Sequence, residues 1–187
     1  MIAGPSGVGK GSVVKELLAR DPAGLALSVS ATTRPPRAAE VEGVDYDFVS
    51  TGQFERMVDE GAMLEWASVY GHFYGTPAAY VEAQLDAGRD VLLEIDVQGA
   101  RQIRDRVPDA ILILLVPPSM EALAERLHGR ATENEEKITT RLAEAEGEVA
   151  QADWFDHVVV NDDLGTASSQ VAAIIEASRS RPEEPST

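Results

Sequence analysis

The chain has 187 residues, no cysteine and a formal net charge of −16 at pH 7. Its length suits one domain with a sizeable core, and its 44% of hydrophobic residues is ordinary for a globular protein. The acidic balance argues against a nucleic-acid partner, which needs a basic face, and the lack of cysteine excludes disulfides and thiolate metal sites. No apolar run approaches the roughly 20 residues that cross a bilayer, and no signal-peptide pattern opens the chain, so we expect no membrane partner and a cytoplasmic location.

A glycine-rich stretch near the N-terminus is the strongest motif. Residues 4–12 follow a short apolar run at 1–3 and lead into apolar residues at helical spacing, so strand, turn and helix are expected in this order. Such a turn curls until several backbone N–H groups point at one phosphate, while the helix N-terminus and a lysine add positive charge. A glycine turn with a chance lysine is the alternative. The predicted ATP-binding residues of this loop are Gly4, Pro5, Ser6, Gly7, Val8, Gly9, Lys10, Gly11 and Ser12.

The next segment predicts short strands and turns instead of a regular α/β alternation. Residues 25–30 alternate and predict a strand, and residues 44–49 predict another. Between them, two prolines make residues 31–37 a loop, which carries Arg34 and Arg37. A solvated turn without a ligand is the alternative for this loop.

An inserted lobe is expected to continue through residue 80. The capping box at 50–53 predicts the start of a helix, and the apolar run at 63–67 contains the carboxylate of Glu65. Residues 71–77 predict a glycine-flanked aromatic turn. Its end predicts a further helix, with Thr76 as the N-cap, Pro77 as the first helical residue and Leu85 near the end.

From residue 91 onward, strands and helices alternate. The predicted strands are 91–96, 111–116 and 157–161, and the predicted helices are about 99–107, 120–127 with Ser119 as the cap, 138–149 and the region around 171–175. A break at 129–132 and a capping box at 132–135 separate two of the helices, and the tail from 181 is expected to be disordered. This pattern favours an α/β fold with a parallel sheet and helices on both faces.

Four separated stretches together resemble the guanylate kinase family over nearly the whole chain, from Gly4 to about Ile175. They are residues 4–12, in which Gly11 and Ser12 follow the lysine as in nucleoside monophosphate kinases, residues 28–37 with 44–48, residues 64–66 with 74–76, and residues 129 onward. The resemblance implies a P-loop parallel sheet with helices on both faces, an inserted mixed α+β GMP-binding lobe and a short helical lid. The single domain of residues 1–187 would then comprise a core (about 1–29, 81–126 and 142–178), the lobe (about 30–80), the lid (about 127–141) and a disordered tail (179–187). The family's first strand is usually longer than residues 1–3, from which we expect that the chain begins late, through truncation or a misplaced start.

The implied activity is ATP:GMP phosphotransfer, which converts GMP, and dGMP as a second acceptor, to the diphosphate by direct in-line transfer, with Mg²⁺ bound to ATP. No side-chain nucleophile is needed, because a GMP phosphate oxygen attacks directly. The family's catalytic residues match Lys10, Arg126, Arg130 and Arg141, of which the arginines belong to the lid region. Its GMP-binding residues match Ser30, Arg34, Arg37, Tyr46, Glu65, Tyr74, Thr76 and Glu94. Asn161 is a candidate for the adenine pocket, and Asp96 is a candidate for contact with Mg²⁺ through water.

Glu65 carries the implied choice of base, because a carboxylate accepts both N1–H and N2–H₂ of guanine, whereas adenine presents an acceptor there. The alternatives are a paired acid near the surface for Glu65, ordinary packing for Tyr46 and Tyr74, and solvated arginines beside glutamates in the lid. Two alternatives concern the whole chain. One is a non-catalytic guanylate-kinase-like binding module, and the other is a kinase of the same fold for another phosphorylated sugar or nucleotide.

Overall fold

The computed structural model describes residues 1–129 and 135–180. The predicted break at 129–132, the capping box at 132–135 and the tail from 181 fall wholly or partly outside these residues. Among the helices described, none is both long and apolar enough to span a membrane.

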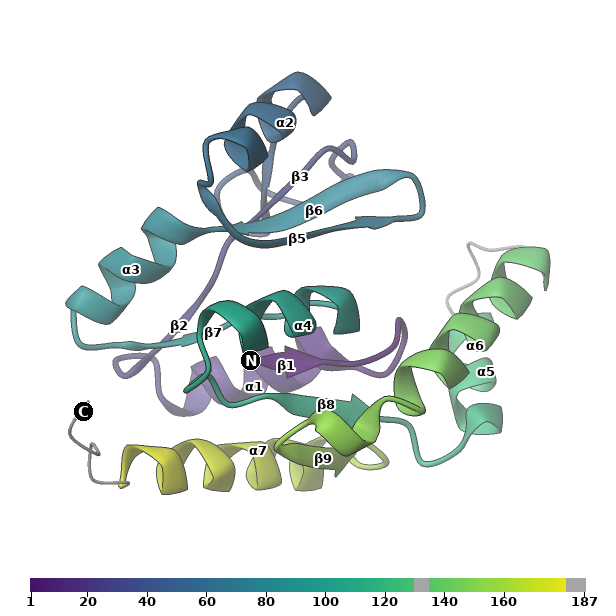
Figure 1. The fold of residues 1–187 in the computed structure, drawn as a ribbon. Helices are drawn as coiled ribbons and strands as arrows, with labels where there is room; N and C mark the ends of the chain where they lie inside the picture. The colour runs from purple at the N-terminus through teal and green to yellow at the C-terminus, as the bar shows by residue number, and fades with distance from the viewer. Residues whose placement is uncertain (130–134, 181–187) are drawn as a thin grey trace.

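A parallel sheet forms the centre of the molecule (Figure 1). The strands β1 (Ile2–Ala3), β8 (Ile113–Val116) and β9 (His157–Val160) pair in parallel, as do β2 (Leu25–Leu27) and β7 (Asp90–Leu92). The two groups meet just after β7, where the Ile2 N–H donates to the Leu93 carbonyl at 2.9 Å and the Ile95 N–H donates to the Ile2 carbonyl at 3.2 Å. The strand order is therefore β2-β7-β1-β8-β9, and the residues that follow β1 and β7 emerge side by side at the carboxyl edge of the sheet.

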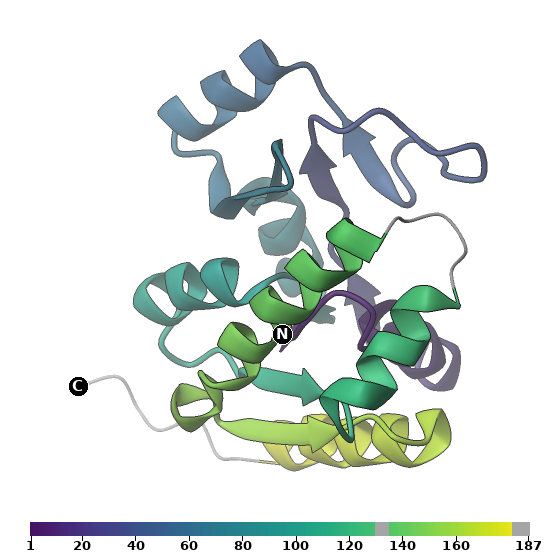
Figure 2. The same ribbon diagram turned by 90° about the vertical axis from the view of Figure 1, so that its right-hand side faces the viewer.

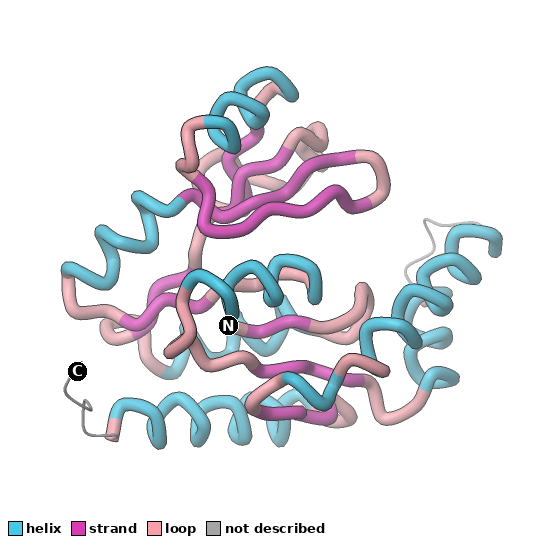
Figure 3. The backbone as a smooth tube through the Cα atoms, viewed as in Figure 1, coloured by secondary structure: helices cyan, strands magenta, loops and turns pink. Residues whose placement is uncertain are grey.

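Helices cover both faces of this sheet, which confirms the predicted fold class (Figure 3). Helices α1 (Lys10–Arg20) and α7 (Leu164–Arg179) pack on one face, and α3 (Ala78–Asp86) and α4 (Val97–Arg106) pack on the other. Strand β8 shows how the sequence specifies this, because successive side chains of a strand point to opposite faces. Ile113 and Leu115 join the first cluster, while Leu114 and Val116 join the second, so a strand covered on both sides is apolar throughout.

A second sheet lies above the first in Figure 1 and is built from residues 30–77. Its strands are ordered β4 (Tyr46–Phe48), β3 (Ser30–Thr32), β6 (His72–Pro77) and β5 (Met63–Val69), with β3 parallel to β4 and antiparallel to β6. Helix α2 (Thr51–Asp59) begins at the predicted capping box, where the side chains of Ser50 and Gln53 each accept the other's backbone N–H. Its Phe54 is buried and stacks on Phe73 with ring centroids 5.4 Å apart, which fixes α2 on this sheet.

Two predicted elements of the lobe are wrong. The strand predicted over 25–30 is split between β2 in the central sheet and β3 in the second sheet, and β3 continues to Thr32, where a loop was predicted. Residues 72–77 form the strand β6 instead of a turn, because both β3 and β5 supply backbone partners for them. Thr76 consequently lies in a strand, and Pro77 is the N-cap of α3, which begins at Ala78.

Near the carboxyl edge of the sheet, two helices form a separate arm (Figure 2). Helix α5 (Met120–His128) begins at its predicted cap, where the Ser119 hydroxyl accepts the N–H of Ala122, and helix α6 spans Glu135–Val149. Buried Leu123, Leu127, Ile138 and Ala145 hold the two helices together. A 3₁₀ turn (Ala152–Trp154) then leads into β9.

Candidate active site

The glycine-rich loop joins β1 to α1 at the carboxyl edge of the sheet. Gly4, Gly7 and Gly9 have φ values of 142°, 89° and 99°, which other residues rarely adopt. A Cβ atom at Gly4 would lie 2.2 Å from the Leu115 carbonyl oxygen, so the loop can lie against β8 only with glycine there. No described side chain caps α1, so the first turn of the helix leaves backbone N–H groups available to an anion.

Two side chains donate hydrogen bonds to carbonyls of this loop. The Lys10 ammonium curls back and donates to the carbonyls of Gly4 and Pro5 at 2.6 and 3.3 Å. Asn161, just after β9, is buried and donates its side-chain N–H to the Val8 carbonyl at 2.7 Å. A Cβ atom at Gly9 would lie 2.5 Å from that same nitrogen of Asn161. Asn161 thus braces the loop, and its predicted contact with adenine stays a prediction.

Glu65 lies deep between the second sheet and α4. Its side chain is 4% exposed, which excludes an acid near the surface, and Oε1 accepts the Thr76 hydroxyl at 2.6 Å. Burial raises the pKa of Glu65 to about 7, an effect that the Thr76 hydrogen bond opposes and the charge of Asp96 reinforces. The pair Glu65–Thr76 is therefore a buried carboxyl group with a hydrogen-bonded hydroxyl beside it.

Helix α4 fixes the position of Glu65 through three residues that sequence reasoning missed. A Cβ atom at Gly99 would lie 2.2 Å from Glu65 Oε2, so only glycine allows this approach. Gln102 accepts the N–H of Trp66 at 3.2 Å and donates to its carbonyl at 2.6 Å, as a strand partner would. Arg106 donates to the Met63 carbonyl at 2.6 Å. A glycine inside a predicted helix was the available signal for the first residue, and the sequence held no signal for the other two.

A second polar cluster of the lobe surrounds Arg34. Its Nε donates to the Tyr74 hydroxyl at 3.1 Å, and its guanidinium lies 5.3 Å from the ring centroid of Tyr46. Glu40, which the sequence analysis missed, binds both terminal nitrogens of Arg34 at 2.9 Å and accepts the Arg37 N–H at 2.7 Å. An acid three residues after two closely spaced arginines was the signal. The structure therefore brings Arg34, Tyr46 and Tyr74 together.

The remaining two residues predicted on the lobe side lie at its margins. The Arg37 side chain is 74% exposed, and its Nη1 lies 3.9 Å from Glu40 Oε1, the carboxylate oxygen that also pairs with Arg34. Ser30 begins β3, directly opposite Tyr46 in the strand register. Its position places it at the junction between the central sheet and the second sheet.

Glu94 stands between the loop and the lobe. Burial raises the pKa of Glu94, which the positive charge of Lys10 opposes, and Glu94 in turn contributes to a raised pKa of Tyr46 after the larger effect of burial. A Cβ atom at Gly11 would lie 3.4 Å from Glu94 Oε2, so the carboxylate takes up space beside the loop where a larger residue would project. Asp96 is the N-cap of α4 and accepts the Gly99 N–H at 2.7 Å.

The predicted lid arginines occupy different places. Arg141 on α6 brings Nη1 to 3.5 Å from the Ser6 hydroxyl of the loop, whereas Arg126 on α5 donates to the Asp162 carbonyl at 3.4 Å, beyond β9. Arg130 lies outside the described residues. Glu148 on α6 was not predicted: burial raises its pKa to about 7, while Lys10 opposes the rise, and its Oε2 is buried without a hydrogen-bond partner among the described residues.

The arrangement defines a class of protein. A phosphate loop at the carboxyl edge of a parallel sheet, together with an inserted lobe that carries two polar clusters, is typical of the P-loop kinases of small phosphorylated acceptors. A family model described as guanylate kinase matches residues 1–178. The chain belongs to the guanylate kinase family.

Individual relatives agree over nearly the full length. The guanylate kinase of Symbiobacterium thermophilum is 49% identical over 181 residues, which cover 97% of this chain and 85% of the relative. That of Gloeobacter violaceus is 50% identical over 175 residues, which cover 94% and 85%. The crystal structure of guanylate kinase from Anaplasma phagocytophilum superimposes with a TM-score of 0.78 at 32% identity and covers 96% of this chain and 85% of that one.

Proposed function

We propose that the protein transfers the γ-phosphoryl group of ATP to GMP, which yields ADP and GDP. The observation that carries this proposal is the buried Glu65 carboxyl beside Thr76, in a lobe whose second polar cluster centres on Arg34. A purine base and a phosphate of one acceptor nucleotide can then occupy the two clusters together. The membership of the chain in the guanylate kinase family supports the same reading.

The base would be selected by hydrogen-bond complementarity. Guanine offers N1–H and N2–H₂ as adjacent donors, which the ionised carboxylate of Glu65 accepts. Its O6 would accept from the Ser30 hydroxyl, and from the Thr76 hydroxyl once that hydroxyl turns from Glu65 to the base. Adenine would turn an acceptor toward Glu65 and leave buried polar groups unpaired, the situation that gives about 10⁴-fold discrimination at such sites. None of these contacts uses the ribose 2′-hydroxyl, so dGMP should also serve as an acceptor.

The acceptor phosphate would be held by Arg34, Arg37, Tyr46 and Tyr74, with Glu94 near the same nucleotide. Arginine suits this task because its planar guanidinium meets two phosphate oxygens at once. Glu40 fixes the orientation of the Arg34 guanidinium in advance. One phosphate oxygen of GMP then attacks the γ-phosphorus in line. The new O–P bond forms as the bond to the β–γ bridging oxygen breaks, and ADP leaves with that electron pair.

The donor side is proposed to consist of residues 4–12, with Asn161 near the adenine. The loop N–H groups and the N-terminus of α1 would surround the β-phosphate, and Lys10 would move from the loop carbonyls to the β- and γ-phosphates. Arg126, Arg130 and Arg141 would neutralise the charge that develops on the transferred group. Catalysis would thus come from positioning and charge neutralisation.

Mg²⁺ is the cofactor that we propose, carried by the phosphates of ATP. Among the described residues, no group of three or more His, Asp or Glu side chains forms a metal site, which fits an ion that keeps most of its water shell. Asp96, the N-cap of α4, would contact the ion through water, and Glu94, two residues earlier in the chain, would be a second acid on the same segment. When bound, the ion would offset the negative charge of the β- and γ-phosphates.

The proposed organisation is the one expected from the family: a lobe at about 30–80 for GMP, a lid at about 127–141 and a core that holds ATP. Closure of lobe and lid would exclude water, which would otherwise be a competing acceptor. A net charge of −16 disfavours nucleic acid as a partner, and we propose a cytoplasmic location without membrane association. The presence of Lys10, Arg34 and Arg37 disfavours a non-catalytic binding module.

A coupled assay of ADP release tests the proposal. With saturating ATP and Mg²⁺, GMP and dGMP should be phosphorylated, while AMP, UMP and CMP should react at least about 10³-fold more slowly. Lys10→Ala is the matched control for contaminating kinases. A preference for a pyrimidine nucleotide or AMP would overturn the assignment of Glu65 to guanine, and no turnover with any acceptor would support the binding module instead.

A further inference from the structure

Tyr70, at the tip of the β5–β6 hairpin, has a backbone conformation that tyrosine rarely adopts. Val69 pairs with His72, so Tyr70 and Gly71 form a two-residue loop with φ values of 51° and 79°. Positive φ at both positions is the backbone of a type I′ turn, which favours Asn-Gly or Asp-Gly. Tyr70 is the one residue other than glycine with a positive φ in the part of the chain that the structure describes. A bulky residue kept in this conformation suggests a function for its side chain.

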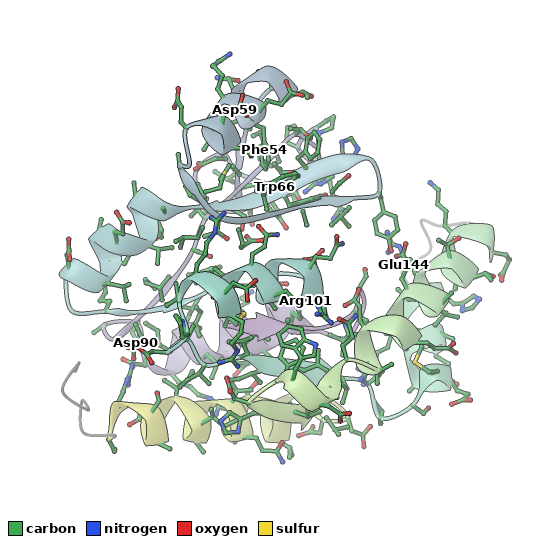
Figure 4. The ribbon with its side chains drawn as sticks, viewed as in Figure 1. Phe54, Asp59, Trp66, Asp90, Arg101 and Glu144 are labelled. Carbon is green, nitrogen blue, oxygen red and sulfur yellow. The ribbon has the colours of Figure 1, made fainter. Side chains whose placement is uncertain are left out.

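The side chain of Tyr70 makes two contacts with α6. Its hydroxyl donates to Glu144 Oε2, and its ring lies under the Arg141 guanidinium, with Cζ 5.0 Å from the ring centroid. Arg141 and Glu144 are three residues apart and so share one side of the helix. Figure 4 shows Glu144 on the side of α6 near the tip of the hairpin. Burial and the nearby carboxylate raise the pKa of Tyr70, so its hydroxyl remains a donor. One residue of the lobe thus engages two residues of the opposite helix.

Arg141 extends this contact to the phosphate loop. Its Nη1 lies 3.5 Å from the Ser6 hydroxyl, so its guanidinium lies between the loop and the Tyr70 ring. An aromatic face attracts a guanidinium and fixes its plane while leaving the N–H groups at its edge for anionic acceptors. Glu144 has the spacing at which an acid pairs with an arginine on a helix, and the Tyr70 hydroxyl competes for that acid.

We propose that Tyr70 is a positioning residue for phosphoryl transfer, which holds Arg141 at the phosphate loop when the β5–β6 hairpin lies against α6. This inference rests on the proposed function, in which Arg141 neutralises charge on the transferred group. The same hairpin carries Glu65 and Thr76. Occupation of the base site and placement of Arg141 are therefore coupled through one two-stranded element, and the chemistry is favoured when the acceptor is in place.

The sharpest test is Tyr70→Asn. This change removes both contacts with α6 and places in the turn a residue that type I′ turns prefer, so the melting temperature should be unchanged or higher. The single-turnover rate constant for transfer from ATP to GMP, measured by rapid quench, should fall about 5- to 30-fold, while the Kd of GMP changes less than about 3-fold. Tyr70→Phe keeps the ring and loses the hydroxyl, so its rate constant should fall about 2- to 5-fold. Val44→Asn, at a valine of the lobe that is 64% exposed, is the control and should keep the wild-type rate.

The double variant Tyr70→Asn/Arg141→Ala shows whether Tyr70 acts through the arginine. Its rate constant should equal that of Arg141→Ala alone, because Tyr70 acts through the Arg141 guanidinium and has nothing to position once that group is removed. A wild-type rate constant in Tyr70→Asn would overturn the positioning role, and so would a loss in Tyr70→Asn that adds in full to the loss in Arg141→Ala. Should Tyr70→Asn not fold, the same two outcomes measured with Tyr70→Phe would overturn it. A wild-type rate in Arg141→Ala would overturn this inference and the role of Arg141 in the proposed function. Absence of GMP phosphorylation by the wild type would refute the proposed function itself.

Discussion

Glu65→Gln should stabilise the protein above pH 7 while it impairs the use of GMP. In the folded protein, burial raises the pKa of Glu65 to about 7 from an ordinary value of 4.5. Folding therefore favours the protonated carboxyl. The free energy of unfolding should be highest below pH 4.5, fall as the pH rises toward 7, and level off above it. Above pH 7 the ionised carboxylate therefore costs stability, and this ionised form is the one that the proposed contact with the base uses.

The magnitude follows from the two pKa values. At 1.36 kcal/mol per pH unit, ionisation of Glu65 lowers the free energy of unfolding by up to about 3 kcal/mol above pH 7. Glutamine keeps the acceptor for the Thr76 hydroxyl and removes the charge, but it adds an NH₂ donor that needs acceptors of its own in a buried place. The net gain expected at pH 8 is about 1–3 kcal/mol, which raises the melting temperature by about 2–4 °C per kcal/mol in a chain of this size. Below pH 4.5 the charge effect is absent, so Glu65→Gln should be no more stable than wild type, and less stable by whatever the new NH₂ group costs.

Two assays on the same pair of proteins test this reasoning. Urea unfolding without nucleotide at pH 4.5 and 8 measures stability, with Glu55→Gln, an exposed acid on α2, as the control for the change in net charge. Steady-state kinetics with GMP and IMP measures base contact. The loss of kcat/KM for GMP should correspond to about 2–4 kcal/mol of activation free energy. The loss for IMP, which lacks N2–H₂, should be smaller, so the effect of the mutation and the effect of removing N2–H₂ should not add. If Glu65→Gln is no more stable than wild type at pH 8, the reasoning from a buried carboxylate is refuted. If the losses for GMP and IMP add in full, contact between Glu65 and the base is refuted.

Three further changes probe the donor side, the lid and the packing around Glu65. Lys10→Ala should leave the melting temperature within a few degrees of wild type, because glycines shape the loop. It should nevertheless lower kcat by roughly 10²-fold or more. A folded variant with normal turnover would show that Lys10 takes no part in the chemistry. Arg130→Ala, at a position outside the described residues, should lower kcat far more than it raises the KM for GMP, and the reverse pattern would make Arg130 a binding residue only. Gly99→Ala should place a methyl group about 2.2 Å from Glu65 Oε2 and so displace that carboxylate, although alanine favours the helix more than glycine does. The kcat/KM for GMP should therefore fall at least about 10-fold. An unchanged value would contradict the close approach of α4 to Glu65.

Patterns of a few residues determined much of the fold. The capping box at Ser50 and the cap at Ser119 lie where they were predicted, because the hydrogen bonds involved join residues three apart. The apolar run of β8 likewise predicted a strand covered on both faces. The phosphate loop was recognisable for the same reason, since the positive φ of Gly4 and Gly9 is a property of the glycines themselves.

Residues that act across long separations could not be found this way. Residues 72–77 resemble a turn in composition, and they form a strand because β3 and β5 lie on either side of them. Residues 25–32 enter two sheets for a similar reason, because each half finds a different neighbouring strand. Local propensity is a weak preference, and pairing with a distant strand overrides it.

The candidate site shows the same division. The sequence alone predicted which residue types face a nucleotide: a lysine in the loop, arginines and tyrosines in the lobe, and one acid in an apolar strand. Only the tertiary structure decided that Glu65 is buried with a raised pKa, that Gly99 makes room for it, and that Tyr70 meets Arg141. Each of these depends on the packing of α4 or α6 against a hairpin far away in the chain. Such packing is set by the shape of the whole core, which no short stretch of sequence contains.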